Sequence, residues 1–276
     1  MIEGQHWLGE GHMVPAEGAA HAAAPAVEIP ILYEDDDLLA VDKPAGMVVH
    51  PAYRHPDGTL FDAVAARQLA RAEGRPCLLH RLDRDTSGVV LLAKTERARQ
   101  ALVRQFEQRR VRKWYLALVC GQPVDRQGEV CQRLRRDTAD RRLVIVAADG
   151  QEAVTRYEVL AMDARWSLLL AEPHTGRTHQ IRVHLAWLGH PIVGDVAYGG
   201  GPPNNAGSAG SPDAAWPRRQ LLHAWSVSVC HPATGAPLRI QAPLPADMAT
   251  LLPAEWHALC AARWREEHCS NEPDRW

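Results

Sequence analysis

Four stretches of the chain repeat their apolar residues with the period of a helix. Between residues 60 and 72, an apolar residue recurs at offsets of 0, 3, 4 and 8, so that these side chains share one side of a helix. These residues are Phe61, Val64, Ala65 and Leu69. We expect helices at 60–72, from a cap at Thr95 to about residue 110, at 178–188 with Gly189 as its stop, and at 246–266.

Shorter segments alternate between apolar and polar residues, or are apolar throughout, as strands are. Residues 111–120 alternate in this way, with Trp114 and Leu116 on one face of the expected strand. The opposite face places the ring of Tyr115 beside the cation of Lys113, an arrangement that suits the wall of a cleft. Further strands are expected at 29–33, 38–42, 89–93, 143–147, 153–160, 166–171, 221–229 and 238–242, the last two forming a hairpin.

The order of these elements indicates a single α+β domain. Runs of strands interrupted by a few helices are typical of a largely antiparallel, mixed sheet with flanking helices. The domain is expected to span residues 27–266, with a flexible N-terminal tail at 1–26 and a C-terminal tail at 267–276. Residues 199–217 are rich in Gly, Pro, Asn and Ser and are expected to form a flexible loop within the domain.

The composition indicates a cytoplasmic protein without a membrane segment. With 276 residues and 46% hydrophobic content, the chain can bury a substantial core. It contains no apolar run of membrane-spanning length, and no basic segment followed by an apolar core marks a secretory signal. The six cysteines are scattered without a C-x-x-C pair, which argues against a cysteine zinc site and favours reduced thiols.

Charge is unevenly distributed along the chain. The net charge is -2, but residues 94–114 carry a net +6 and residues 133–142 a net +3, while acidic residues gather at 34–37. A basic face of this kind fits RNA binding. A solvated amphipathic surface explains the same distribution and is the commoner case, so charge alone leaves both interpretations open.

The loop at residues 80–88 carries the densest candidate chemistry. It holds two carboxylates, two guanidinium groups and two hydroxyl groups just before an apolar strand, where rigid elements position side chains for chemistry. An arginine beside a carboxylate keeps it ionised even where water is excluded, so an aspartate of this loop is a candidate nucleophile. The alternative is an Asp/Ser turn with solvated charges, in which Asp85 is a turn acceptor.

A second dense stretch, residues 174–184, contains three histidines spaced five apart. Residues five apart on a helix point about 140° away from each other, because each residue turns about 100°. Metal-binding helices use spacings of three or four, so no metal site is expected here. Gly176, Arg177 and Thr178 at the expected helix start instead favour an anion such as phosphate, bound by free N–H groups and a capping hydroxyl.

These strings resemble the motifs of the RluA family of RNA pseudouridine synthases. His-Arg-Leu-Asp followed by Thr-Ser-Gly within residues 80–88 resembles the motif of the family's catalytic aspartate, which corresponds to Asp83. Residues 175–184 are similar to a later motif, whose arginine pairs with the catalytic aspartate in the family and corresponds to Arg182. Further similarities, in the same order as in the family, are residues 42–51, the aromatic position at Tyr115, and residues 190–195, 222–224 and 231–232.

The resemblance covers about residues 29–255 and implies one catalytic domain of the pseudouridine synthase fold with a central cleft. It implies Asp83 as the catalytic residue, Arg182 as the partner that keeps it ionised, and Tyr115 as the ring that stacks on the uracil. Many family members carry an S4-type RNA-binding domain before the catalytic domain, which the Ala/Gly-rich residues 1–26 do not resemble. RNA contacts are therefore expected from the catalytic domain itself, at Arg81, Arg84, Lys113, Arg177, Thr178 and His179.

The implied reaction breaks the bond between uracil N1 and ribose C1′ and forms a new bond from C5. The target uridine must therefore be flipped out of a helix or taken from a loop. The substrate is expected to be large-subunit ribosomal RNA or transfer RNA, not DNA, bound by a monomer that needs neither a metal nor another cofactor. Arg81 and Arg84 either contact phosphate, fill the gap left by the base, or form structural ion pairs.

Two alternatives stand beside this interpretation. A hydrolase forming a covalent ester on Asp83 would need a second carboxylate or a water-activating histidine, which the sequence does not place on a matching face. A non-catalytic RNA-binding or ribosome-assembly protein of the same fold would not need the carboxylate. The combination of Asp83, Tyr115 and Arg182 therefore favours the enzyme.

Overall fold

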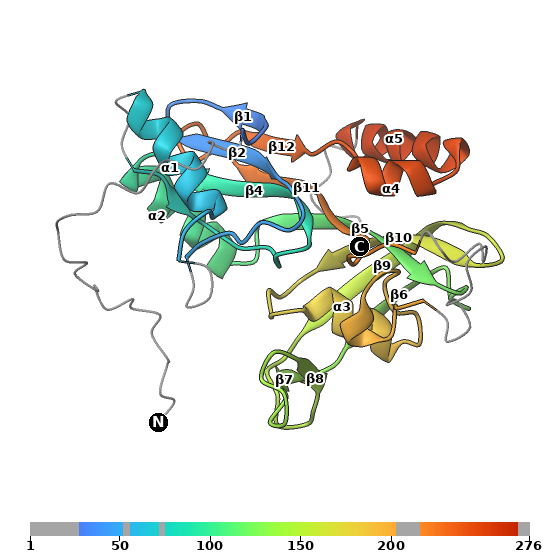
Figure 1. Ribbon diagram of the computed structural model, residues 1–276. Helices are drawn as coiled ribbons and strands as arrows, with labels where there is room; N and C mark the ends of the chain where they lie inside the picture. Colours follow the sequence, from blue (N-terminus) through green and yellow to red (C-terminus); the bar gives the residue numbers. More distant parts are fainter. Residues whose placement is uncertain (1–27, 52–55, 72–74, 203–215, 270–276) are drawn as a thin grey trace.

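The computed structural model describes residues 28–51, 56–71, 75–202 and 216–269 (Figure 1). The expected tail at 1–26, most of the expected loop at 199–217 and residues 270–276 lie outside the described residues. The strands are β1 (Ile31–Glu34), β2 (Leu38–Lys43), β3 (Cys77–Leu78), β4 (Ser87–Ala93), β5 (Arg112–Cys120), β6 (Gln127–Cys131), β7 (Leu134–Arg136), β8 (Val144–Val146), β9 (Val154–Met162), β10 (Trp166–Pro173), β11 (Leu222–Cys230) and β12 (Pro237–Gln241). The helices are α1 (Leu60–Ala70), α2 (Glu96–Glu107), α3 (Gln180–Trp187), the 3-10 turn η1 (Val196–Tyr198), α4 (Ala246–Leu251) and α5 (Ala254–Cys269).

One large sheet forms the body of the domain. Across the described ranges it has ten strands, in the order β1-β2-β4-β11-β5-β10-β9-β6, with β12 paired to β11 and β3 to β4. All of these pairs are antiparallel except β4 with β11, which run parallel. Strands β7 and β8 form a separate hairpin that projects from the sheet (Figure 1). The predicted α+β domain with a largely antiparallel, mixed sheet is confirmed.

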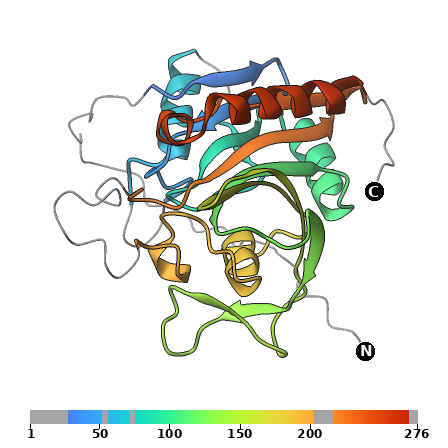
Figure 2. The same cartoon turned by 90° about the vertical axis from the view of Figure 1, so that its right-hand side faces the viewer.

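The two faces of the sheet pack against different helices. Along β5, Tyr115 and Ala117 belong to the core that also receives α1 and α3, whereas Trp114 and Leu116 belong to the core under α4 and α5. The alternation predicted for residues 111–120 is therefore confirmed. Figure 2 shows α5 along one side of the curved sheet and α3 beneath its arched strands on the other. No helix within the described ranges is long and apolar enough to cross a membrane.

Local sequence determines where the first two helices begin. The hydroxyl of Thr95 accepts the N–H of Ala98 at 3.1 Å and caps α2 as predicted. The hydroxyl of Thr59 accepts the N–H of Asp62, and the Asp62 carboxylate in turn accepts the N–H of Thr59 at 3.0 Å. This reciprocal pair is a capping box, which satisfies backbone donors that a helix leaves free at its start.

Three features differ from the sequence-based expectations. The helix expected at 246–266 is two helices, α4 and α5, because Pro253 disfavours a helical backbone at Leu252, whose ψ is 135°. Helix α3 begins at Gln180 instead of residue 178, because His179 adopts a left-handed backbone with φ of 54°. Strands β3, β6 and β7 were not predicted, since β3 has two residues and the other two each bury a single residue, Val130 and Leu134.

Glu34, at the end of β1, forms an ion pair that links α1 to the sheet. Its carboxylate accepts two hydrogen bonds from Arg67 of α1, at 3.0 and 2.6 Å, and one from Lys94 at 3.2 Å. The hydrogen bond from Arg67 is the leading cause that lowers the pKa of Glu34 from 4.5 to about 2. The folded protein therefore favours the charged carboxylate more than the unfolded chain does.

Replacement of Glu34 by Gln is expected to lower the free energy of unfolding by about 1–2 kcal/mol at neutral pH. Because the pKa is lower in the folded than in the unfolded state, this contribution is complete above pH 4.5 and is lost as the pH falls toward about 2. Urea unfolding of both proteins at neutral pH and at two acidic values measures the difference. A difference that stayed constant with pH would contradict the role given to the charged carboxylate.

Candidate active site

The loop that carries Asp83 connects β3 to β4, and a buried lysine stabilises its backbone through hydrogen bonds. The side chain of Lys43, at the end of β2, is fully buried and donates to three backbone carbonyl groups, including that of Arg84 at 2.9 Å. The N–H of Thr86 donates to the carbonyl of Asp83 at 3.1 Å and closes a turn. The backbone on both sides of Asp83 is thereby held in place.

The start of β4 joins this loop to β11. Ser87 Oγ lies 2.9 Å from His223 Nδ1, and Gly88 pairs with Ala224 in the parallel register. A Cβ atom on Gly88 would lie 2.2 Å from the carbonyl oxygen of Ala224, and the φ of Gly88 is +111°. Only glycine adopts this backbone without strain and allows so close an approach. The position of Asp83 therefore depends on the pairing of β4 with β11.

Arg182 of α3 is shared between two carboxylates. Its Nη1 donates to Asp83 Oδ2 at 3.1 Å, which is the contact expected for this pair. Its Nε and Nη2 donate to Asp195 Oδ2 and Oδ1, at 2.7 and 2.9 Å. Asp195 is 1% exposed, so this fork-shaped pair is shielded from water. Asp195 thus fixes the guanidinium plane and directs Nη1 at Asp83.

Asp195→Asn is expected to lower the rate of the reaction more than the stability of the fold. The amide would present N–H groups to a guanidinium that has no acceptor, at a cost of about 2 kcal/mol in the free energy of unfolding. The freed guanidinium would also lose its direction toward Asp83, and a shift of about 1 Å at reacting groups lowers rates by about 100-fold. Turnover and urea unfolding of the variant check both effects. Turnover equal to that of the wild type would contradict the orienting role of Asp195.

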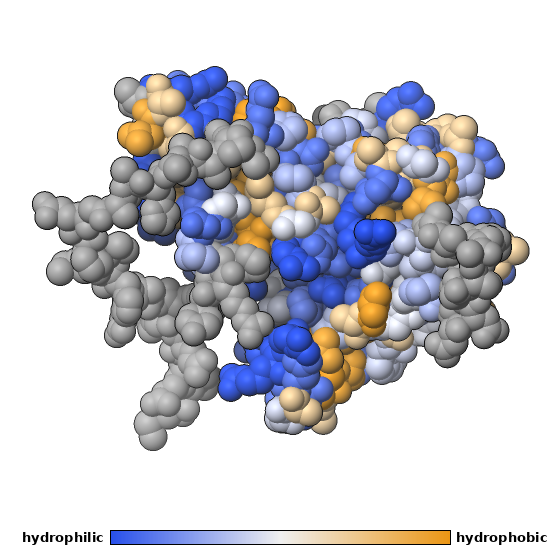
Figure 3. Space-filling view, in the orientation of Figure 1, coloured by the Kyte–Doolittle hydropathy of each residue, from blue (hydrophilic) through white to orange (hydrophobic). Residues whose placement is uncertain are grey.

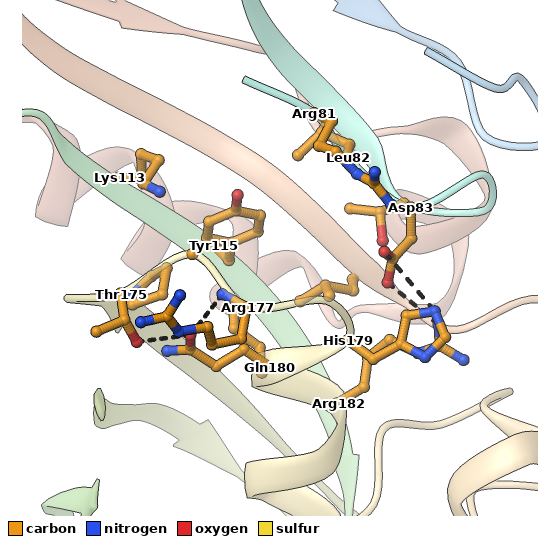
Figure 4. Close-up of a pocket in the computed structure, with 15 residues that line it drawn as sticks. Arg81, Leu82, Asp83, Lys113, Tyr115, Thr175, Arg177, His179, Gln180 and Arg182 are labelled. Atoms are coloured by element: carbon orange, nitrogen blue, oxygen red, sulfur yellow. Dashed lines mark hydrogen bonds and ion pairs between the residues drawn. The ribbon is translucent and has the colours of Figure 1, made fainter. Parts of the chain in front are cut away.

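Tyr115 forms a wall of a pocket together with Asp83 and Arg182 (Figure 4). The pocket contains about 490 Å³ of empty space, part of which is open to solvent. The residues paired with Tyr115 across the sheet are Ala171 on β10 and Ala224 on β11, both of which have small side chains. Burial, and to a lesser degree the charge of Asp83, raises the pKa of Tyr115, which keeps the phenol neutral. The pocket therefore offers an aromatic ring and a carboxylate to one small, flat group.

Cations surround this pocket. Arg81, Lys113 and Arg177 line it, and Asp83 is the only carboxylate among the residues that line it. Two further hollows share Gly176 and Arg177 with this pocket. One is also lined by Lys113. The other lies beside the β7–β8 hairpin and is lined by Arg135 and Arg136. Figure 3 shows hydrophilic side chains over this hairpin and across the middle of the same face. A polyanion could therefore pass over the pocket along a positively charged path.

The remaining candidates for RNA contact, Arg84, Thr178 and His179, lie in three different places. Arg84 is exposed and pairs with Asp85 at 3.0 Å, outside the pocket lining. Thr178 lines the hollow beside the hairpin, and His179 lines the pocket itself. The anion site expected at the start of the helix needs correction, because His179 is the N-cap residue and no side chain caps the helix. The N–H of Arg177 is also not free, since it donates to Gln180 Oε1 at 3.0 Å.

The three histidines of residues 174–184 contact different parts of the structure. His184 is fully buried and contacts Thr155 Oγ1 at 2.9 Å, whereas His179 faces Asp83 and His174 lies 4.0 Å from Glu172. Within the described part of the chain, no group of three or more His, Cys, Asp or Glu side chains could hold a metal ion.

Sequence reasoning missed several residues that shape the site. Asp195, Lys43 and Tyr198 had no assigned role, although Asp195 and Lys43 fall inside strings that resemble family motifs. Tyr198 lies in η1, and its ring packs over the Arg182 guanidinium at 4.9 Å. Its only sequence signal was an aromatic residue just before a glycine-rich stretch, which does not reveal a contact with α3.

Comparison with known proteins agrees with this geometry. The family model described as RNA pseudouridylate synthase matches residues 37–187. Ribosomal large subunit pseudouridine synthase D of Xanthomonas campestris pv. campestris is 43% identical, covering 87% of this chain and 73% of that protein. The protein of the same name from Nitrosomonas europaea is 42% identical, covering 90% and 72%. The structure of human RNA pseudouridylate synthase domain containing 4 aligns with a TM-score of 0.65 at 26% identity, covering 80% of this chain and 90% of that one.

Proposed function

The chain belongs to the RNA pseudouridylate synthase family and is an isomerase that acts on RNA, and from this premise we propose that it modifies uridine in large-subunit ribosomal RNA, with Asp83 as its catalytic residue. The observation that carries the proposal is the carboxylate of Asp83, ion-paired with Arg182 at 3.1 Å inside a pocket walled by Tyr115. The names of the two bacterial relatives favour this RNA over transfer RNA.

The reaction moves uracil from N1 to C5 on the same ribose carbon. The bond between N1 and C1′ breaks, C5 bonds to C1′, the hydrogen on C5 leaves as a proton, and N1 takes up a proton. Whether the carboxylate attacks C1′, adds to C6 or takes a sugar proton, it must be ionised in a site from which the base excludes water. The Arg182 guanidinium, 3.1 Å away, supplies a charge-assisted hydrogen bond to that carboxylate. The ring of Tyr115 would stack on the detached uracil, and such stacking contributes about 1–3 kcal/mol per base.

The same chemistry favours RNA over DNA, because thymine carries a methyl group where uracil has the hydrogen that leaves. RNA contacts belong to the proposal at Arg81, Lys113 and Arg177 around the pocket, and at Arg84 and Thr178 beside it. His179, the sixth residue expected to contact RNA, lines the pocket next to Asp83. The proposal also includes a monomer that needs no cofactor and works in the cytoplasm, where a ribosomal substrate is assembled.

Lys113→Ala and Arg177→Ala are each expected to weaken binding to the RNA and to reduce its salt dependence. A cation that contacts one phosphate of a single strand contributes about 0.7 to the slope of log K against log salt concentration. Filter binding at several salt concentrations measures this slope. Arg126→Ala, an exposed arginine outside the pocket and its adjoining hollows, is the matched control and should leave the slope unchanged. Equal slopes in all three variants would contradict the RNA contacts.

The proposed function is tested by release of tritium from RNA labelled at uridine C5. Large-subunit ribosomal RNA, the assembled large subunit and transfer RNA are incubated with the protein in separate reactions. Release from either ribosomal sample supports the proposal. Release from transfer RNA alone would overturn the assigned substrate, and no release from any of the three would overturn the activity.

A further inference from the structure

A histidine lies beside the second oxygen of the catalytic carboxylate. Arg182 binds Asp83 Oδ2, and His179 Nε2 lies 3.9 Å from Asp83 Oδ1 (Figure 4). This separation is longer than a hydrogen bond. Contacts of this kind at catalytic groups often shorten when the substrate closes the site. The two oxygens of Asp83 therefore face two different nitrogen groups.

The ring of His179 is held from its other side by Tyr198. His179 Nδ1 lies 2.7 Å from Tyr198 Oη, and the two rings meet edge to face at an interplanar angle of 77°. Tyr198 Oη also accepts the backbone N–H of Val144 in β8 at 2.9 Å. The left-handed backbone of His179, with φ of 54°, costs energy in a residue other than glycine and is retained here. These contacts specify one orientation of the imidazole.

The hydrogen bonds also favour one tautomer of the ring. Because Tyr198 Oη already accepts the Val144 N–H, its own hydrogen is available to donate to His179 Nδ1. A neutral imidazole that accepts at Nδ1 carries its hydrogen on Nε2, which faces Asp83. The opposite tautomer would direct a lone pair at an ionised carboxylate. Burial lowers the pKa of His179 despite the opposing charge of Asp83, so the neutral form prevails near neutral pH.

We propose that His179 is a positioning residue for the reaction, which holds Asp83 Oδ1 through its Nε2–H while Tyr198 fixes its tautomer. The inference rests on the proposed function, in which Asp83 is the catalytic residue. Once Nε2 closes to hydrogen-bond distance, Arg182 on Oδ2 and His179 on Oδ1 would restrict rotation of the carboxylate and leave its remaining lone pairs for the flipped-out uridine. The structure thereby gives His179 a role distinct from contact with the RNA backbone.

The proposal is tested with His179→Ala, His179→Gln and Tyr198→Phe in single-turnover tritium release on labelled large-subunit RNA, with filter binding beside it. His179→Ala should lower the rate by up to about 100-fold, because misplacement of a reacting group costs about that much, and leave Kd within twofold. His179→Gln retains an N–H donor and should recover part of the rate. Tyr198→Phe should lower the rate less, and adding it to His179→Ala should cause no further loss. His257→Gln, a histidine on α5, is the control and should keep the wild-type rate.

Several outcomes would overturn the positioning role. An unchanged rate with Kd raised tenfold would make His179 an RNA contact. Independent, multiplicative losses in the double variant would show that Tyr198 does not act through His179. Failure of the wild type to release tritium would count against the proposed function. The tautomer of His179 can still be measured in that case, because its nitrogen chemical shifts do not depend on turnover.

The nitrogen chemical shifts of the imidazole in the free protein report its tautomer. In protein labelled with ¹⁵N at histidine, His179 is identified by the signal that disappears in His179→Gln. Hydrogen on Nε2 in the wild type, with a mixed population in Tyr198→Phe, is the expected result. Hydrogen on Nδ1 in the wild type would overturn the proposal whatever the activity.

Discussion

Asp83→Asn is expected to abolish turnover while leaving the fold and RNA binding intact. Asparagine has the shape of aspartate, and its amide oxygen can still accept the hydrogen bond from Arg182 Nη1, so the pocket should keep its form. The amide carries no charge and cannot act as nucleophile or base. Loss of such a group lowers rates by about 10⁴-fold or more.

Single-turnover tritium release with excess enzyme measures this loss, and filter binding measures the affinity. Asp85→Asn is the matched control in the same loop, since Asp85 pairs with Arg84 outside the pocket lining. That variant should retain at least about a third of the wild-type rate, in line with the small contribution of exposed ion pairs. Because asparagine can deamidate to aspartate, Asp83→Ala is measured in parallel. A variant at Asp83 that kept a tenth of the rate would remove this residue from the mechanism.

The second large effect is expected from Gly88→Ala, which should destabilise the fold by at least about 3 kcal/mol. The added methyl group would lie 2.2 Å from the carbonyl oxygen of Ala224, in the backbone of the paired strand. Backbone cannot yield as a side chain does, and overpacking of this kind adds about 1–3 kcal/mol to the strain of a positive φ. The pairing of β4 with β11, and with it the loop of Asp83, would be displaced.

Urea unfolding measures the stability of Gly88→Ala, and Gly235→Ala is its control. Gly235 has a φ of +72°, and among the described residues no atom beyond its chain neighbours lies within 4 Å of the place its Cβ would take, so it tests the backbone strain alone. Its variant should lose about 1–2 kcal/mol. Equal losses in the two variants would show that contact with Ala224 is unimportant.

The local parts of this fold follow from the sequence because each depends on neighbouring residues. The alternation along β5 places Tyr115 on the pocket face, and Thr95 caps α2 through a contact three residues away. The break between α4 and α5 carried a signal as well, since Pro253 lies inside the expected helix. Strands β6 and β7 carried no apolar alternation, because each of them buries only one residue.

The site could be predicted only in part, because its contacts join distant segments. The resemblance indicated that Arg182 would lie beside Asp83, but not that Asp195 would hold two of its nitrogen atoms. The left-handed backbone of His179 is uncommon outside glycine, and its ring packs against Tyr198. Spacing along the chain does not reveal such contacts, since they arise when α3, η1 and the β7–β8 hairpin come together.

The central position of β11 has a consequence for folding during translation. This strand, Leu222–Cys230, lies between β4 and β5, although both precede it by about a hundred residues or more in the chain. Until it emerges during translation, the two halves of the sheet expose unpaired edges that can join other chains. A product terminated before residue 222 would contain Asp83, Tyr115 and Arg182 and yet be inactive and prone to aggregate. Chaperones that shield strand edges should therefore matter most for this protein after β5 has been made and before β11 has emerged.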